Sequence, residues 1–223
     1  MKRQLLTAFI IIGLMFFAAP NLAQAPEQKV KVACVGNSIT EGAGLTKTYP
    51  DVLQELLGDS YEVRNYGIGG RTLLRKGDYP YWNETKYKEV LTWTPNIVII
   101  KLGTNDTKPQ NWQFKDEFIE DYVDLINSFK NLPSKPTVLI CNPIPVFEDK
   151  WGINQAVMDN EVIPAMKEIA EQAEVQIIDV YQPFLGKADL TYDAIHPNDE
   201  GAGFLATEIY KALKTSKTVI VDR

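Results

Sequence analysis

The stretch that decides the fold is Val30-Lys31-Val32-Ala33-Cys34-Val35, which leads directly into Gly36-Asn37-Ser38-Ile39-Thr40. Its apolar residues are nearly continuous rather than alternating, as in a strand that is buried on both faces of a parallel sheet. Two later runs share this pattern, and two shorter, more polar runs complete the set. The five predicted strands are 30–35, 61–65, 96–102, 137–141 and 175–179.

Segments with helical spacing of their apolar residues separate these strands. The predicted helices are 50–57, 83–93, 115–130, 155–173 and 199–213. Alternation of strand and helix with short connections predicts right-handed crossovers, and therefore an α/β fold: a three-layer α/β/α sandwich around a five-stranded parallel sheet. Residues 218–223 are equally compatible with a short terminal strand and a tail.

The first 25 of the 223 residues have the composition of a secretory signal peptide. Lys2 and Arg3 precede an apolar run, 5–19, that is too short to span a bilayer comfortably, and Ala23-Gln24-Ala25 resembles a cleavage site. An uncleaved anchor helix is the less favoured alternative. We therefore expect an exported protein, periplasmic or extracellular, with residues 26–223 forming a single domain and no membrane span after cleavage.

Charge excludes one class of partner. Without Lys2 and Arg3, the 23 basic residues become 21 against 29 acidic residues, a net charge of −8. An acidic chain without a basic cluster is a poor binder of nucleic acid or of anionic membranes. We expect a small-molecule or glycan substrate instead; the oligomeric state is not predicted.

Two cysteines and one histidine argue against a metal centre. Cys34 and Cys141 fall in core strands that the expected topology does not make neighbours, so buried free thiols are favoured over a disulfide. With a single histidine, these cysteines form no zinc-binding spacing.

The single histidine, His196, lies in Asp193-Ala194-Ile195-His196 near the C-terminus. A carboxylate three residues upstream can orient the imidazole and stabilise its protonated form, as in a Ser-His-Asp triad. Ser38 follows the first strand, and ligands bind outside the carboxyl ends of parallel strands. Taken alone, Ser38 is better interpreted as a plain helix cap, and Asp193 with His196 is equally compatible with an incidental pair. Gly70 and Asn105 also follow predicted strands, although each loop alone is compatible with a simple turn.

Four segments in this order resemble the SGNH hydrolases, also called the GDSL family of esterases and acylhydrolases. They are Gly36-Asn37-Ser38-Ile39, Gly69-Gly70-Arg71, Gly103-Thr104-Asn105-Asp106 and Asp193-Ala194-Ile195-His196. The resemblance implies a flavodoxin-like SGNH hydrolase fold for residues 26–223. It also implies Ser38 as nucleophile, His196 as base and Asp193 as its partner, with an oxyanion hole of the Ser38 and Gly70 amides and the Asn105 side chain. It requires no metal or organic cofactor. Asn37 departs from the Asp of the family name and removes a negative charge beside the nucleophile.

Within this family, the stretches 36–42 and 70–74 look like those of exported bacterial carbohydrate O-acetylesterases, including sialate-type enzymes. This resemblance implies a secreted serine esterase that removes acetyl or other short acyl groups from sugars. Trp112 and Trp151 are candidate sugar-stacking residues, and Arg71 is a candidate partner for an acidic sugar, although ordinary loop anchors and a structural salt bridge remain open for them. The alternatives are a lysophospholipase or thioesterase of the same fold, and a non-catalytic glycan-binding module.

Overall fold

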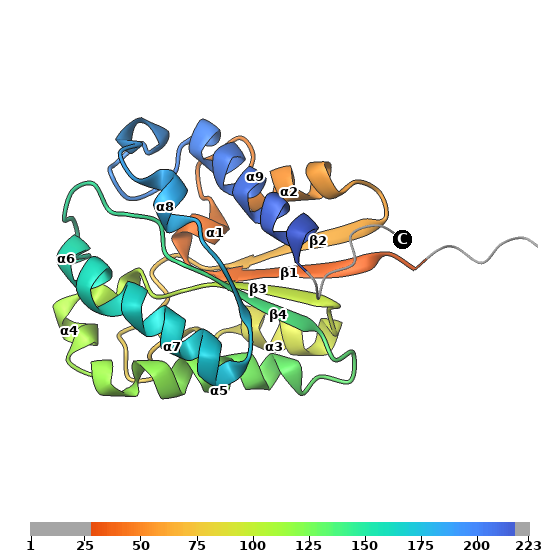
Figure 1. Ribbon diagram of the computed structural model, residues 1–223, viewed down its shortest axis with the longest axis horizontal. Coiled ribbons are helices and arrows are strands. Elements are labelled where there is room, and N and C mark those ends of the chain that lie inside the picture. The colour runs from red at the N-terminus through yellow and green to blue at the C-terminus, as the bar shows by residue number, and fades with distance from the viewer. Residues whose placement is uncertain (1–27, 217–223) are drawn as a thin grey trace, which may run out of the picture.

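The computed structural model describes residues 28–216, which form a parallel sheet covered by helices on both faces (Figure 1). The strands are β1 (Val30–Gly36), β2 (Tyr61–Gly67), β3 (Ile97–Lys101), β4 (Thr137–Cys141) and β5 (Gln176–Ile178). Their order is β2-β1-β3-β4-β5, and every pair is parallel. The predicted five-stranded α/β/α sandwich is confirmed. The predicted signal peptide, 1–25, and the segment 218–223 lie outside the described residues.

The two faces of the sheet carry different helices. One face packs against α2 (Tyr49–Leu57), α8 (Tyr181–Phe184) and α9 (Asp199–Thr215), and the other against α3 (Thr85–Trp93), α5 (Phe118–Lys130) and α7 (Ile163–Ala173). The central strands explain this arrangement, because side chains that alternate along β1 and β3 are buried in the two separate cores.

One expected helix is interrupted. The segment 155–173 is not a continuous α-helix but consists of α6 (Gln155–Val157), a π-helical turn (Met158–Val162) and α7. Pro164 stands in the first turn of α7 and has no amide to donate to the turn before it, which explains why the regular hydrogen-bond ladder is broken there. The short helices α1 (Ser38–Glu41), α4 (Pro109–Trp112) and α8 have no counterpart among the five predicted helices, because a single helical turn has no recognisable periodicity.

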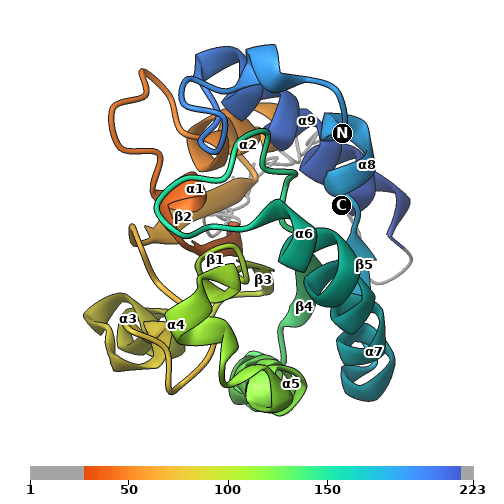
Figure 2. The same cartoon turned by 90° about the vertical axis from the view of Figure 1, so that its left-hand side faces the viewer.

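The carboxyl ends of the strands meet at one edge of the sheet, which faces the viewer in Figure 2. The strand order reverses between β1 and β3, so the chain leaves these neighbouring strands toward opposite faces. Such a reversal opens a crevice between the loops. The connection from β4 to α6 arches across this edge close to α1.

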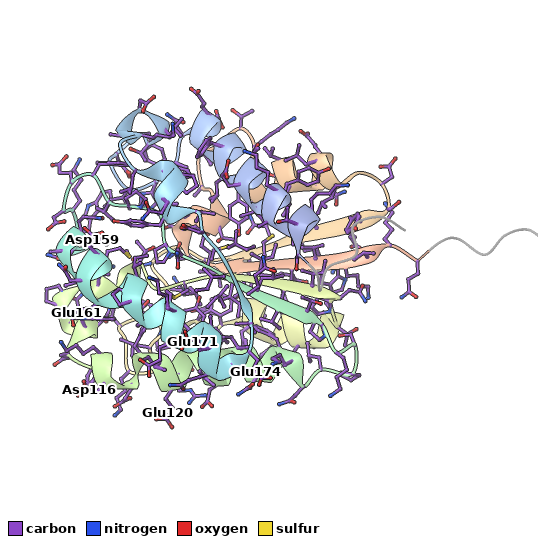
Figure 3. The ribbon with its side chains drawn as sticks, viewed as in Figure 1. Asp116, Glu120, Asp159, Glu161, Glu171 and Glu174 are labelled. Atoms are coloured by element: carbon purple, nitrogen blue, oxygen red, sulfur yellow. The ribbon has the colours of Figure 1, made fainter. Side chains whose placement is uncertain are left out.

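Three further expectations from the sequence concern the two thiols, membrane-spanning helices and surface charge. Cys34 and Cys141 are buried free thiols, on strands that β3 separates. Within residues 28–216, no helix is long and apolar enough to cross a membrane. Figure 3 shows acidic side chains on the turn before α5, on α5, on the π-helical turn and at the C-terminal end of α7. Its labelled residues are Asp116, Glu120, Asp159, Glu161, Glu171 and Glu174.

Candidate active site

Ser38 is presented by the sharp turn from β1 into α1. Asn37 caps this helix, and its side-chain oxygen accepts a hydrogen bond from the Ile39 amide at 3.1 Å. Residue 36 must be glycine, since a Cβ there would stand 2.0 Å from Thr40 Oγ1 and 2.8 Å from the Lys101 carbonyl oxygen. The turn therefore places Ser38 at the first helical position, at the carboxyl edge of the sheet.

The loop 191–197 brings Asp193 and His196 to the same edge. Ser38 Oγ lies 2.8 Å from His196 Nε2, and His196 Nδ1 lies 2.7 Å from Asp193 Oδ2. Ala194 between them has a φ of 73°, in the left-handed region, and this tight turn lets both side chains face each other. The structure thus joins the three residues that the sequence singled out into one hydrogen-bonded chain.

Hydrogen bonding keeps Asp193 ionised. Partial burial by itself would raise the pKa of this carboxyl, but bonds from the His196 amide, the His196 ring and the Ile195 amide outweigh it, so the pKa falls below its ordinary value. Asp193 Oδ1 accepts from the His196 amide at 2.6 Å and from the Ile195 amide at 3.0 Å. The negative charge of Asp193 holds the imidazole proton on Nδ1, which leaves the basic lone pair at Nε2 facing the serine.

Three N–H donors in the loops after β1, β2 and β3 are candidates for an oxyanion hole. Within residues 28–216, the amides of Ser38 and Gly70 donate no hydrogen bond to the protein. Gly70 has a φ of 77°, which favours glycine at this point of the loop. Asn105 follows β3; its Nδ2 donates to the Arg71 carbonyl at 3.1 Å, so the second N–H of its carboxamide is available for a ligand.

Asp106 is a residue of this site that sequence reasoning did not single out. Its side chain is fully buried, and its two oxygens accept hydrogen bonds from the Leu74 amide at 2.8 Å and the Leu73 amide at 3.1 Å. Together, Asn105 and Asp106 hold the segment that follows Gly70 at three points. Burial raises the pKa of Asp106 to about 6, although the backbone amides oppose this shift. The sequence signal that could have identified Asp106 is its position directly after Asn105 in Gly103-Thr104-Asn105-Asp106.

The candidate substrate-binding residues occupy different environments. The Arg71 guanidinium donates to Glu84 Oε1 at 2.9 Å and to the Gly69 carbonyl at 2.7 Å, which is the structural salt bridge left open by the sequence. Trp112 packs edge-on against Phe118, with ring centroids 5.2 Å apart. Trp151 contacts the triad, since its ring centroid lies 5.8 Å from that of His196.

Tyr192 was missed, although it immediately precedes Asp193 in the sequence. Its ring stacks on the imidazole of His196 with a centroid distance of 5.7 Å and an angle of 14° between the ring planes. Sequence spacing carried no sign of this contact because it depends on the tight turn at Ala194. The imidazole is therefore flanked by two aromatic rings as well as by its hydrogen-bond partners.

Taken together, this arrangement has the parts needed for nucleophilic catalysis on an acyl group. It contains a hydroxyl, a base within hydrogen-bond reach and an ionised partner that orients the base, together with backbone and side-chain N–H groups in loops at the same edge of the sheet. The site assembles from loops after β1, β2 and β3 and from the loop before α9.

Comparison with known proteins shows which family the chain resembles. Residues 34–203 match the model of the GDSL-like Lipase/Acylhydrolase family. An acetylxylan esterase of Xylanibacter ruminicola is 41% identical over 210 residues, which is 84% of this chain and 44% of the relative. The chain thus spans less than half the length of that protein.

Solved structures agree on the fold. The acetyl xylan esterase AlAXEase superposes with a TM-score of 0.67 at 25% identity, covering 82% of this chain and 99% of that one. Axe2, an acetylxylan esterase from Geobacillus stearothermophilus, was solved as a catalytic mutant and gives 0.66 at 21% identity, covering 88% and 98%. Est24, a carbohydrate acetylesterase from Sinorhizobium meliloti, gives 0.64 at 21% identity, covering 83% and 98%. The family prediction is confirmed: the chain belongs to the GDSL-like lipase/acylhydrolase family.

Proposed function

We propose that the protein is a carbohydrate O-acetylesterase, acting on acetylated xylan or a chemically similar glycan. The hydrogen-bonded chain Ser38–His196–Asp193 carries the proposal, because it is assembled for attack on an ester carbonyl. The 41% identical relative is an acetylxylan esterase, which favours acetyl groups on a xylan-type polymer. A non-catalytic glycan-binding module would not need this arrangement of base and nucleophile.

In the proposed reaction, Ser38 Oγ attacks the ester carbonyl while His196 Nε2 accepts its proton. The amides of Ser38 and Gly70 and the free N–H of Asn105 stabilise the oxyanion that forms. His196 then donates the proton to the departing sugar oxygen, leaving an acetyl group on Ser38. Water activated by His196 hydrolyses this intermediate. Asp193 stabilises the imidazolium at each transfer.

The hollow beside the nucleophile is small. The cavity that touches Ser38 and His196 has a volume of only about 10 Å³, roughly the volume that one water molecule requires. It is lined by Ser38, Ile39, Gly42, Ala43, Leu45, Tyr192, His196 and Pro197. A lysophospholipase or thioesterase would need a longer apolar channel there. We also propose that the enzyme acts outside the cytoplasm, on the strength of the composition of residues 1–25.

The test compares acyl lengths and then glycans. p-Nitrophenyl esters from acetate to octanoate are assayed first, and acetate release from acetylated xylan second, with Ser38→Ala as the control for background hydrolysis. Acetate is expected to be the best ester, with a steep fall beyond butyrate. An acyl channel would instead raise kcat/KM about fourfold per methylene, since burial of each CH₂ contributes ~0.8 kcal/mol. A maximum at hexanoate or longer would favour the lysophospholipase or thioesterase alternative.

A further inference from the structure

Trp151 stands exposed beside the catalytic histidine. Its side chain is 63% exposed, the highest value among the large hydrophobic residues that the structure describes. Its ring lies 5.8 Å from the His196 ring, between centroids, and is tilted by 49° to it. The Tyr192 ring stacks parallel to the imidazole of His196 and covers one face of it. Tyr192 therefore supports the imidazole. An aromatic ring exposed beside the reacting group is positioned to contact a ligand that enters the site.

The loop that carries Trp151 is fastened to the triad loop. The Phe147 amide donates to the Ala194 carbonyl at 2.9 Å, and Lys150 Nζ donates to the Asp193 carbonyl at 3.3 Å. Both acceptors belong to the turn that positions Asp193 and His196. The indole is therefore held in place relative to the base, as a preformed binding surface requires.

The backbone at Trp151 is strained. Its φ is 53°, in the left-handed region that residues with a bulky side chain rarely adopt, and Gly152 follows with a φ of 81°. A conformation of this kind is energetically unfavourable and persists where the surrounding contacts enforce it. Here it turns the indole outward at the tip of the loop instead of into the core.

The proton transfer from His196 determines which part of the substrate lies next to the Trp151 ring. His196 Nε2 must lie within hydrogen-bond reach of the leaving oxygen, because it donates the proton that converts this oxygen to an alcohol. The alcohol moiety therefore departs next to His196 and its neighbours, whereas the carbonyl oxygen points to the amides of Ser38 and Gly70. For an acetylated glycan, the alcohol moiety is a pyranose ring, which has a flat face of C–H groups that packs on an aromatic ring.

We propose that Trp151 is the stacking platform for the sugar ring whose hydroxyl carries the acetyl group. This subsite rests on the proposed function, since it supplies the sugar side of the same active site. It predicts that Trp151 selects the alcohol part of the ester and contributes nothing to attack on the carbonyl. Esters whose alcohol has no ring should not depend on it.

The experiment compares two acetate esters, an acetylated methyl xyloside and ethyl acetate, by following acetate release. Trp151→Ala should raise KM for the xyloside about tenfold, the effect of losing one aromatic contact of roughly 1.4 kcal/mol, with a smaller change in kcat. Kinetics with ethyl acetate should stay within about twofold of the wild type. Trp151→Phe should recover part of the loss, because it restores a ring.

Tyr79→Ala serves as the matched control. Tyr79 is 58% exposed, but its ring lies over Arg71 rather than His196, so the variant should behave as the wild type on both esters. The proposal is overturned if Trp151→Ala leaves the xyloside unaffected, impairs both esters equally, or matches Tyr79→Ala. If the wild type hydrolyses ethyl acetate but no acetylated sugar, the proposed function itself fails. Unfolding midpoints of all variants verify that the fold is retained.

Discussion

Replacing Lys101 by methionine should stabilise the protein at neutral pH. Lys101 ends β3 with its side chain 1% exposed, and within residues 28–216 its Nζ has no hydrogen-bond partner. Burial lowers the pKa of this amine from 10.5 to about 8, with the neighbouring Cys141 acting in the opposite direction. Methionine has nearly the same length and no charge, so it fills the space without the buried cation.

The magnitude follows from the two pKa values. The folded state binds the proton less tightly than the unfolded chain by about 2.5 pH units, and each unit corresponds to 1.36 kcal/mol, which gives a cost of about 3 kcal/mol. Below pH 8 the lysine is charged in both states and this cost is fully present. As the pH rises from 8 to 10.5, the folded protein releases the proton first, so the cost declines and then vanishes.

Urea unfolding of the wild type and Lys101→Met, measured in parallel from about pH 7 to about pH 10, tests this reasoning. At neutral pH the unfolding midpoint should rise by ~1–2 M urea, and the difference in the free energy of unfolding should shrink above pH 8. An exposed control, Lys47→Met, should show a small difference without this pH dependence. A less stable Lys101→Met variant at neutral pH, or a gain that is constant with pH, would refute the reasoning.

Other variants and the two thiols test the proposed site and the fold. Ser38→Ala should abolish ester hydrolysis while circular dichroism stays unchanged; turnover near the wild-type rate would contradict its role as nucleophile. Asn105→Ala should lower kcat ~10²–10³-fold with little change in KM, because its donor acts mainly in the transition state; a change confined to KM would assign it to substrate binding. Asp106→Asn should also lower kcat more than it raises KM, since an amide oxygen cannot replace both carboxylate acceptors for Leu73 and Leu74; unaltered kinetics would show that the loop does not need this anchor. Cys34 and Cys141 should both react with a thiol reagent after unfolding without reductant, and protection of both would mean that they form a disulfide.

The fold was accessible from the sequence because its signals are local, and the candidate triad was accessible through four segments that resemble one family. Continuous apolar runs such as Val32–Val35 suit only strands that are covered on both faces, and alternation with helices then dictates a parallel sheet. In a parallel sheet every carboxyl end lies at one edge. Ser38, placed after the first strand, and His196, in a loop near the last helix, could therefore be predicted to lie at the same edge although they are 158 positions apart in the sequence.

Where local signals were absent, sequence reasoning stopped short. The helix expected over 155–173 contains a π-helical turn because Pro164 lacks an amide, whereas the apolar spacing around it continues without interruption. Trp112 and Trp151 looked alike as loop aromatics. Only the packed structure sets one against Phe118 and the other beside His196.

The sequence by itself determined the layered sheet, its catalytic edge and the residue types able to act there, since these follow from the periodicity of apolar residues and from short motifs. The tertiary structure alone decided how these groups are supported. Asp106 reaches back to Leu73 and Leu74 across more than 30 residues, Tyr192 stacks on His196 because Ala194 adopts a left-handed turn, and Lys101 is enclosed without a partner. Such contacts depend on which side chains and backbone groups meet once the sheet and its loops have packed. The spacing of residues along the chain carries no information about which distant groups will meet.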